Sequence, residues 1–141
     1  MKVNHCNHAS NALRGNVLII NPERRPITKN MAICLDNFSQ IIQGSMEARV
    51  YPEKGVAFIY DENWDTLRLP VNRVFFNGKH RLVLHGTFIV VGAAIDDTTN
   101  TITFTGLTRE QLHEFKSRFT PTVRMMMVDG RPEPMFDLLA K

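Results

Sequence analysis

The sequence has little of what marks an exported, membrane-spanning or disulfide-stabilised protein. Its 2 cysteines are too few to form the disulfide framework of a small secreted domain. Its longest apolar run covers residues 88–95, whereas a membrane helix needs about 20 such residues. Residues 1–15 contain no apolar run, so they lack the hydrophobic region of a secretory signal. We therefore expect a protein of a reducing cytoplasm that has no membrane partner.

Sequence motifs of catalysis and of cofactor binding are also missing. There is no Gly-x-Ser-x-Gly elbow, no His-Glu-x-x-His pair and no glycine-rich loop that would cradle phosphates. His5, Cys6 and His8 bring three potential metal ligands together, but no spaced Cys/His pair completes a zinc site, and terminal arms are commonly polar. The sequence thus predicts no catalytic residue, no bound metal and no cofactor.

Charge of one sign is scarce as well. The 17 Lys and Arg residues against 14 Asp and Glu residues leave a formal charge of +3. A small basic group at residues 79–81 follows Phe75 and Phe76, whose rings would suit stacking on bases, yet neighbouring residues of a strand face opposite sides. Nucleic acid is therefore a less favoured partner than a protein or a small anion.

What is present is the composition of an ordinary folded domain. Of the 141 residues, 43% are hydrophobic and 22% are charged, close to the average of soluble globular proteins. This length suits one hydrophobic core. We predict a polar N-terminal arm at 1–15, a single α+β domain at 16–120, and a C-terminal strand and short helix at 121–141 that extend the same domain.

Short runs of apolar or alternating residues, bounded by turn residues, predict the strands. They cover residues 17–20, 31–34, 46–51, 56–60, 73–76, 79–84, 86–95, 101–105 and 123–128. Asn77-Gly78 is typical of a type I′ turn and predicts a hairpin around it. Residues 86–95 are nearly all apolar or small, which is typical of a central strand covered on both faces.

Three segments have helical signals. After Asp36, a residue that can cap a helix, apolar residues at helical spacing predict a helix at about 37–43 that ends at Gly44. Thr108 and Gln111 have the spacing of a capping box and predict a helix at about 109–118. Residues 135–140 follow a proline and predict a terminal helical turn. Because hairpins outnumber crossovers, we predict an α+β fold: a mostly antiparallel twisted sheet of about 6–8 strands with two helices packed on one face.

The turn at Pro70 carries the strongest candidate binding residues. Asn72 and Arg73 follow it, and the guanidinium of Arg73 has five donors that can grip a carboxylate or a phosphate. Gly86 would let a backbone amide approach a ligand, and Thr87 stands next to it. The same residues suit an internal brace equally well, because an arginine can also hold backbone carbonyls. The sequence leaves both roles open.

Several of these stretches also carry a family resemblance. They are Asn21-Pro22, residues 41–44 with Met46-Glu47, Tyr60-Asp61-Glu62, residues 69–73, residues 86–92 and residues 107–111. Their order across residues 17–119 resembles a domain-of-unknown-function family of small proteins from phages, plasmids and integrative elements, mainly of Gram-positive bacteria. The resemblance implies an accessory protein of a mobile element, made in the host cytoplasm, with no established catalytic residue. The chain departs from that pattern in its longer leader, in the single Gly44 and in its tail.

The motif positions add Tyr60 and Glu62 to the candidate binding residues, together with Arg49 on the preceding strand. We expect an accessory binding protein, acting against or alongside a host system, that captures a host protein or a small anionic signal such as a nucleotide without chemistry. One alternative is a nucleic-acid-associated accessory factor. Another is a small hydrolase of a signalling nucleotide that uses Asp61, Glu62 and His85. A homodimer through the methionines at 125–127 also stays open.

Overall fold

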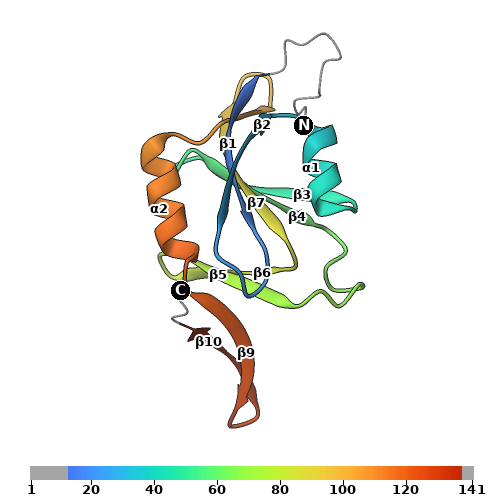
Figure 1. The fold of residues 1–141 in the computed structure, drawn as a ribbon, viewed down its shortest axis with the longest axis vertical. Coiled ribbons are helices and arrows are strands. Elements are labelled where there is room, and N and C mark those ends of the chain that lie inside the picture. The colour runs from blue at the N-terminus through green and yellow to red at the C-terminus, as the bar shows by residue number, and fades with distance from the viewer. Residues whose placement is uncertain (1–12, 138–141) are drawn as a thin grey trace.

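The computed structural model describes residues 13–137, which form ten strands and two helices. In chain order these are β1 (Arg14–Ile20), β2 (Ile27–Ala32), α1 (Leu35–Ile42), β3 (Met46–Tyr51), β4 (Val56–Asp61), β5 (Val71–Asn77), β6 (His80–His85), β7 (Phe88–Asp96), β8 (Thr101–Thr105), α2 (Arg109–Phe119), β9 (Thr122–Val128) and β10 (Arg131–Asp137). Figure 1 shows a sheet between the two helices, with a two-stranded arm, β9–β10, projecting from one end. The predicted α+β class is confirmed.

A six-stranded antiparallel sheet forms the centre of the fold. Its order is β2-β1-β7-β4-β3, and β8 pairs with the second half of β7. The first half of β7 lies between β1 and β4. Where β8 ends, the backbone passes so close to β1 that a Cβ on Gly15 would lie 2.5 Å from the Cα of Gly106. The two glycines therefore allow two strands to share one side of β7.

The central strand β7 is apolar on both faces, as the sequence predicts. Phe88 and Val90 point to one side of the sheet, Ile89 and Val91 point to the other, and all four are fully buried. Such a strand is stable only where both faces of its sheet are covered.

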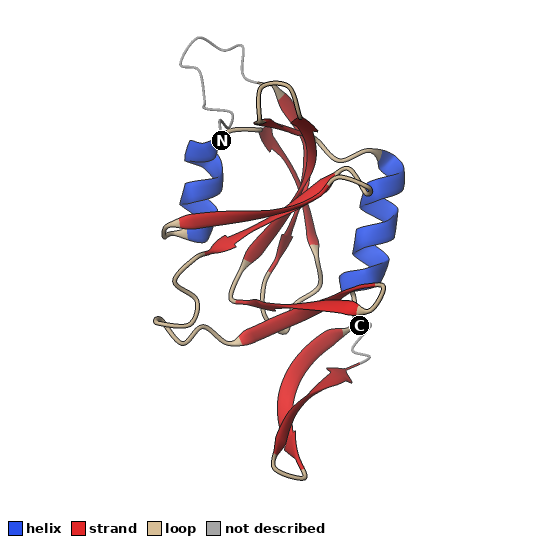
Figure 2. Ribbon diagram, turned by 180° about the vertical axis from the view of Figure 1, so that it is seen from behind, coloured by secondary structure: helices blue, strands red, loops and turns tan. Residues whose placement is uncertain are grey.

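The two helices cover opposite faces, so the expectation that both pack on one face is wrong. Phe38 of α1 packs with Ile89 and Val91, whereas Phe115 and Phe119 of α2 pack on the side of Phe88. Figure 2 shows the helices on opposite sides of the strands. The apolar stripe of a helix indicates that it packs on a sheet but not on which face. Burial of β7 on both faces requires the arrangement observed.

The residues that cap the short helix α1 differ from the predicted ones at both ends. Cys34 is the N-cap residue, and Asp36 lies in the first turn, where a negative charge favours the helix N-terminus. The left-handed residue at the C-terminus is Gln43, with φ 60°, and not Gly44. Gly44 is needed for another reason, because a side chain there would collide with the buried carboxylate of Asp61.

Helix α2 has the predicted N-terminus. The Gln111 backbone N–H donates to the Thr108 Oγ1, and the Thr108 N–H donates to the Gln111 Oε1, so the capping box is complete. The Gln111 side chain also donates to the carbonyls of Lys54 and Gly55. One side chain thus caps the helix and attaches it to the β3–β4 turn.

Two hairpins stand outside the main sheet. The β5–β6 hairpin forms where the sequence predicts one, but its turn is Gly78-Lys79 and not Asn77-Gly78, because Asn77 ends β5 and pairs with His80. The hairpin places Phe75 and Leu84 in the core on the α2 face. The other hairpin, β9–β10, turns at residues 129–130, both with positive φ. The predicted terminal helix is therefore wrong as far as Asp137, because this turn directs the chain back along β9 as a strand. The rest of that prediction, at 138–140, lies outside the described residues.

The aromatic cluster on the α2 face gives a direct test of the fold. Phe58 is fully buried and meets the rings of Tyr51, Phe75, Phe88, Phe115 and Phe119 at centroid distances of 4.9–6.0 Å. We predict that Phe58→Ala lowers the free energy of unfolding by about 3–5 kcal/mol in urea denaturation, because it leaves a cavity at the centre of this cluster. The control Phe76→Ala removes a ring that is 46% exposed and should cost far less. Equal losses for the two variants would contradict this packing.

Candidate functional site

The predicted site residues Asn72 and Arg73 are buried and do not face solvent. Their side chains are 0% and 1% exposed. The register of β5 and β6 shifts between Val71 and Arg73, which leaves Asn72 as the extra residue of a β-bulge. Adjacent residues of a regular strand would face opposite sides, so the bulge allows both polar side chains to turn inward.

The polar atoms of both side chains are used inside the protein. The Asn72 amide donates to the carbonyls of Ile20 and Gly86 at 2.8 and 2.7 Å. The Arg73 Nε donates to the Phe119 carbonyl at 2.8 Å, one terminal nitrogen donates to the Asn72 carbonyl and Oδ1, and the other donates to the Arg24 carbonyl. Arg73 thus joins β5 to the end of α2 and to the β1–β2 turn.

This arrangement is the internal brace that the sequence leaves open beside ligand binding. Burial lowers the pKa of Arg73 from its ordinary value to about 10, so the guanidinium stays protonated at neutral pH. Phe119 is the last residue of α2, and a cation at that position also complements the negative end of the helix dipole. The donors expected to reach a ligand are therefore committed to backbone carbonyls.

Gly86 and Thr87 lie beside this brace. Gly86 has φ +70°, its N–H donates to the Pro70 carbonyl at 2.7 Å, and a Cβ there would lie 2.7 Å from Leu69 Cδ1. The Thr87 hydroxyl donates to Asn21 Oδ1 at 2.8 Å. Gly86 thus holds the Pro70 turn against the start of β7, and Thr87 attaches the start of β7 to the β1–β2 turn.

The remaining predicted residues lie elsewhere. Glu62 is exposed in the turn after β4, where its backbone N–H donates to the Ser45 carbonyl. Tyr60 is half-buried, and its pKa is raised by burial and by its hydrogen bond to the Glu47 carboxylate. Arg49 is exposed on β3, with its guanidinium 6.0 Å from the centre of the Tyr51 ring. The structure thus does not bring the seven candidates into one place.

Asp61 and His85, two of the residues predicted for the hydrolase alternative, make contacts with the loop that follows β4. The buried Asp61 carboxylate accepts the Asn63 N–H at 2.8 Å. His85 stacks on Trp64 at 4.2 Å, and its Nδ1 lies 3.0 Å from the Leu69 carbonyl. Within residues 13–137, no three His, Cys, Asp or Glu side chains are grouped to hold a metal. His5, Cys6 and His8 lie outside the described residues.

A cationic recess forms where the β5–β6 hairpin meets the edge strand β3. It has a volume of about 90 Å³. Its lining, which we call the basic recess, consists of Arg49, Tyr51, Phe75, Asn77, His80, Arg81 and Leu82. Burial raises the pKa of Tyr51, so its phenol keeps its proton at neutral pH and can donate a hydrogen bond. Two guanidinium groups, an imidazole and a phenol can together accept an anionic group.

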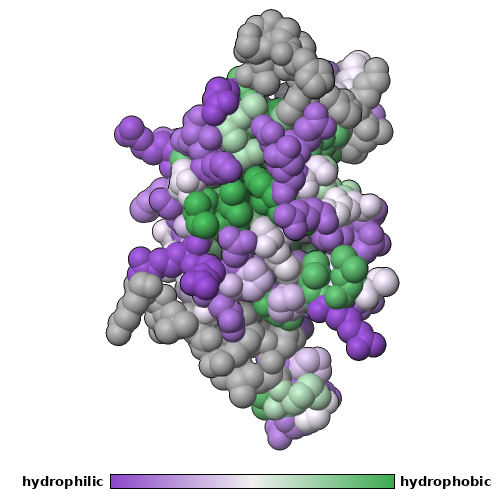
Figure 3. Space-filling view, turned by 45° about the vertical axis from the view of Figure 1, so that its right-hand side comes forward, coloured by the Kyte–Doolittle hydropathy of each residue, from purple (hydrophilic) through white to green (hydrophobic). Residues whose placement is uncertain are grey.

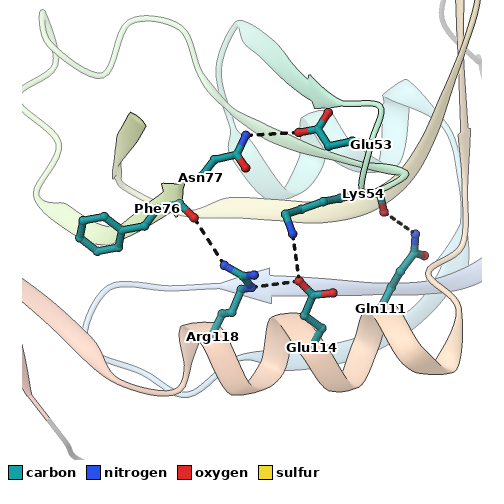
Figure 4. Close-up of polar contacts among 7 residues, drawn as sticks. All are labelled: Glu53, Lys54, Phe76, Asn77, Gln111, Glu114 and Arg118. Carbon is teal, nitrogen blue, oxygen red and sulfur yellow. Dashed lines mark hydrogen bonds and ion pairs between the residues drawn. The ribbon is translucent and has the colours of Figure 1, made fainter. Parts of the chain in front are cut away.

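Most cations beside the recess already have an acceptor. Figure 4 shows Glu114 of α2 accepting from both Lys54 and Arg118, and Asn77 donating to Glu53. Among the described residues, these Glu114 contacts are the ion pairs of the region, and neither includes a guanidinium of the recess. Neither Arg49 nor Arg81 therefore has an ion-pair partner among the described residues.

Comparison with known proteins identifies the family. A family model described as a domain of unknown function, DUF3846, matches residues 14–120. The chain belongs to the DUF3846 family. No curated protein and no solved structure matches the chain. Neither described helix of the DUF3846 protein has the length and apolar content needed to cross a membrane.

Sequence reasoning found Arg49 but missed how the basic recess is assembled. His80 and Arg81 appear in the sequence only as a small basic group that follows a hairpin turn. They come near Arg49 because the β5–β6 hairpin folds over the α2 face, a contact between segments some thirty residues apart. The Asn77-Gly78 dipeptide is the available signal, since it predicts that residues 80 and 81 lie next to β5.

The bracing role of Arg73 in the DUF3846 domain predicts a large stability effect. Arg73→Ala should lower the free energy of unfolding by about 3 kcal/mol or more, because it leaves buried carbonyls of three segments without a donor. The matched control Arg81→Ala, an exposed arginine of the same hairpin, should change stability by less than about 0.5 kcal/mol. Urea unfolding of both variants measures the difference. Small and equal losses would show that Arg73 is not a brace.

Proposed function

We propose that this DUF3846 protein is an accessory binding protein that holds an anionic group in the basic recess and performs no chemistry there. The observation that carries the proposal is the convergence of Arg49, His80 and Arg81 on one small recess with no ion-pair partner among the described residues. Arg49 and Arg81 are exposed, so their guanidinium groups can donate charge-assisted hydrogen bonds to an anion that enters the recess.

The volume of the recess and the aromatic rings that line it restrict the size and type of ligand that fits. About 90 Å³ suits one phosphate or carboxylate group and not a whole nucleotide. The rings of Tyr51 and Phe75 line the recess and offer an apolar surface beside the charges. We infer that the charged group enters the recess while the rest of the ligand, a small nucleotide signal or the side chain of a host protein, lies across its open side.

The biological setting of the proposal follows from the family resemblance. We infer from that resemblance that the protein belongs to a mobile element and acts on a component of its host. An accessory protein that binds a host signal or a host protein would work in the host cytoplasm, alongside or against a host system.

A titration tests this function. Wild-type protein is titrated by calorimetry with inorganic pyrophosphate and with a nucleoside diphosphate, and we expect binding of at least one. Arg81→Glu should weaken it at least tenfold, since a charged hydrogen bond contributes about 1.5–3 kcal/mol. The control Arg109→Glu makes the same charge change in the first turn of α2, where an acidic residue is tolerated, and should leave binding unchanged.

Two results would contradict the proposal. One is binding that falls equally in Arg81→Glu and Arg109→Glu, which would show a response to net charge alone. The other is the lack of binding by wild-type protein to both phosphates and to an acidic peptide offered as a model of a host segment.

A further inference from the structure

The edge strand β3 offers an unpaired row of backbone groups. It lies at one end of the main sheet, and no strand of the described residues pairs with its outer side. Ser45 lies opposite Glu62, one residue before the first β3–β4 pair, and its carbonyl accepts the Glu62 N–H at 2.9 Å. Ser45 and Glu62 are therefore a hydrogen-bonded pair of this ladder. Because such pairs alternate along an antiparallel ladder, Glu47, Arg49 and Tyr51 bond to β4. The backbone groups of the residues between them point outward.

The outward-pointing residues are Met46, Ala48 and Val50. Their side chains are partly buried against the core on the α1 face. On the other face of the same strand, Glu47 and Arg49 are exposed. Exposed edges are commonly blocked by proline, by a bulge or by charges that repel another strand. β3 has six residues in regular register with no bulge, and its two charges have opposite signs.

We propose that β3 pairs antiparallel with β3 of a second copy of this chain, across a two-fold axis at Ala48. This pairing would join the two main sheets into one continuous sheet. Ala48 then lies opposite Ala48 of the second copy, Met46 lies opposite Val50, and Glu47 lies opposite Arg49. The Ala48 pair lies on the axis and occurs once, whereas the two-fold symmetry makes the other two contacts twice.

Charge selects this register among the possible ones. An axis at Glu47 or at Arg49 would place like charges directly opposite each other, which is destabilising. An axis at Met46 or at Val50 would leave Glu47 and Arg49 without opposite charges across the new interface. An axis at Ala48 pairs both charges, and it uses the outward N–H and C=O groups of Ala48 for the ladder. The Glu47 and Arg49 pairs then occupy the non-hydrogen-bonded positions, where side chains approach most closely.

The α1 face supplies apolar surface for the same interface. An open cavity of about 240 Å³ lies there beside β3, lined by Leu35, Met46, Glu47, Ala48, Ile59 and Phe104. The α1 side is turned toward the viewer in Figure 3, which shows apolar side chains exposed among hydrophilic ones. Pairing of β3 would place Met46 and Val50 of the second copy next to this cavity and extend the apolar contact.

Charge reversal tests the proposal by native mass spectrometry and light scattering over a concentration series. Wild-type protein should form a dimer. Glu47→Arg and Arg49→Glu should each raise the dimer dissociation constant by roughly tenfold or more, since two attractive pairs become repulsive. The double variant E47R/R49E should regain the dimer, and an equimolar mixture of the two single variants should form a heterodimer.

Both charges are exposed, so circular dichroism melting should show that every variant folds.

Three outcomes would overturn this interface. They are a wild-type monomer at every concentration, a dimer that both single reversals leave unchanged, and a double variant that stays monomeric. A dimer that both reversals leave unchanged would point to another surface, such as the exposed Met127 of β9. The control Arg109→Glu should remain dimeric. Arg81→Glu, which tests the basic recess, should also remain dimeric, so failure of the proposed function and failure of this interface are distinguishable.

Discussion

The guanidinium of Arg73 is the interaction on which the position of the β5–β6 hairpin depends. It bonds to carbonyls at the end of α2, in the β1–β2 turn and in its own strand, and Asn72 adds bonds to β1 and to the start of β7. Three segments distant in sequence therefore meet at one buried charge. Removal of a buried donor leaves its acceptors unsatisfied, so the hairpin cannot shift without a large cost in free energy.

The functional surfaces are a consequence of how the central sheet is covered. β7 needs cover on both faces, which separates α1 from α2 and leaves one small helix on the first face. The second face needs the β5–β6 hairpin as well as α2, and the hairpin creates the basic recess where it meets β3. The same strand β3 ends the sheet and leaves its outer side for a second copy. The recess and the edge strand are thus neighbours, and Arg49 belongs to both.

Local signals in the sequence were sufficient for much of the fold. Alternation of apolar residues predicted the β3–β4 hairpin, Asn77-Gly78 predicted the next hairpin, and the capping box predicted α2. Predictions failed where the outcome depends on distant partners. The face taken by α1 and the burial of Arg73 depend on contacts with residues far along the chain. Arg73 resembled a binding residue because its donors suit ligand anions and backbone carbonyls equally.

Arg73 is buried and holds backbone carbonyls, whereas we propose that the exposed Arg81 binds an anion, and one NMR experiment tests this difference. The Nε–H signals of Arg73 and Arg81 are followed while inorganic pyrophosphate is added, and their exchange with solvent is measured. We expect the Arg73 signal to exchange slowly and to stay in place, and the Arg81 signal to shift as pyrophosphate binds. A shift of the Arg73 signal, or its rapid exchange, with no change at Arg81 would contradict the account.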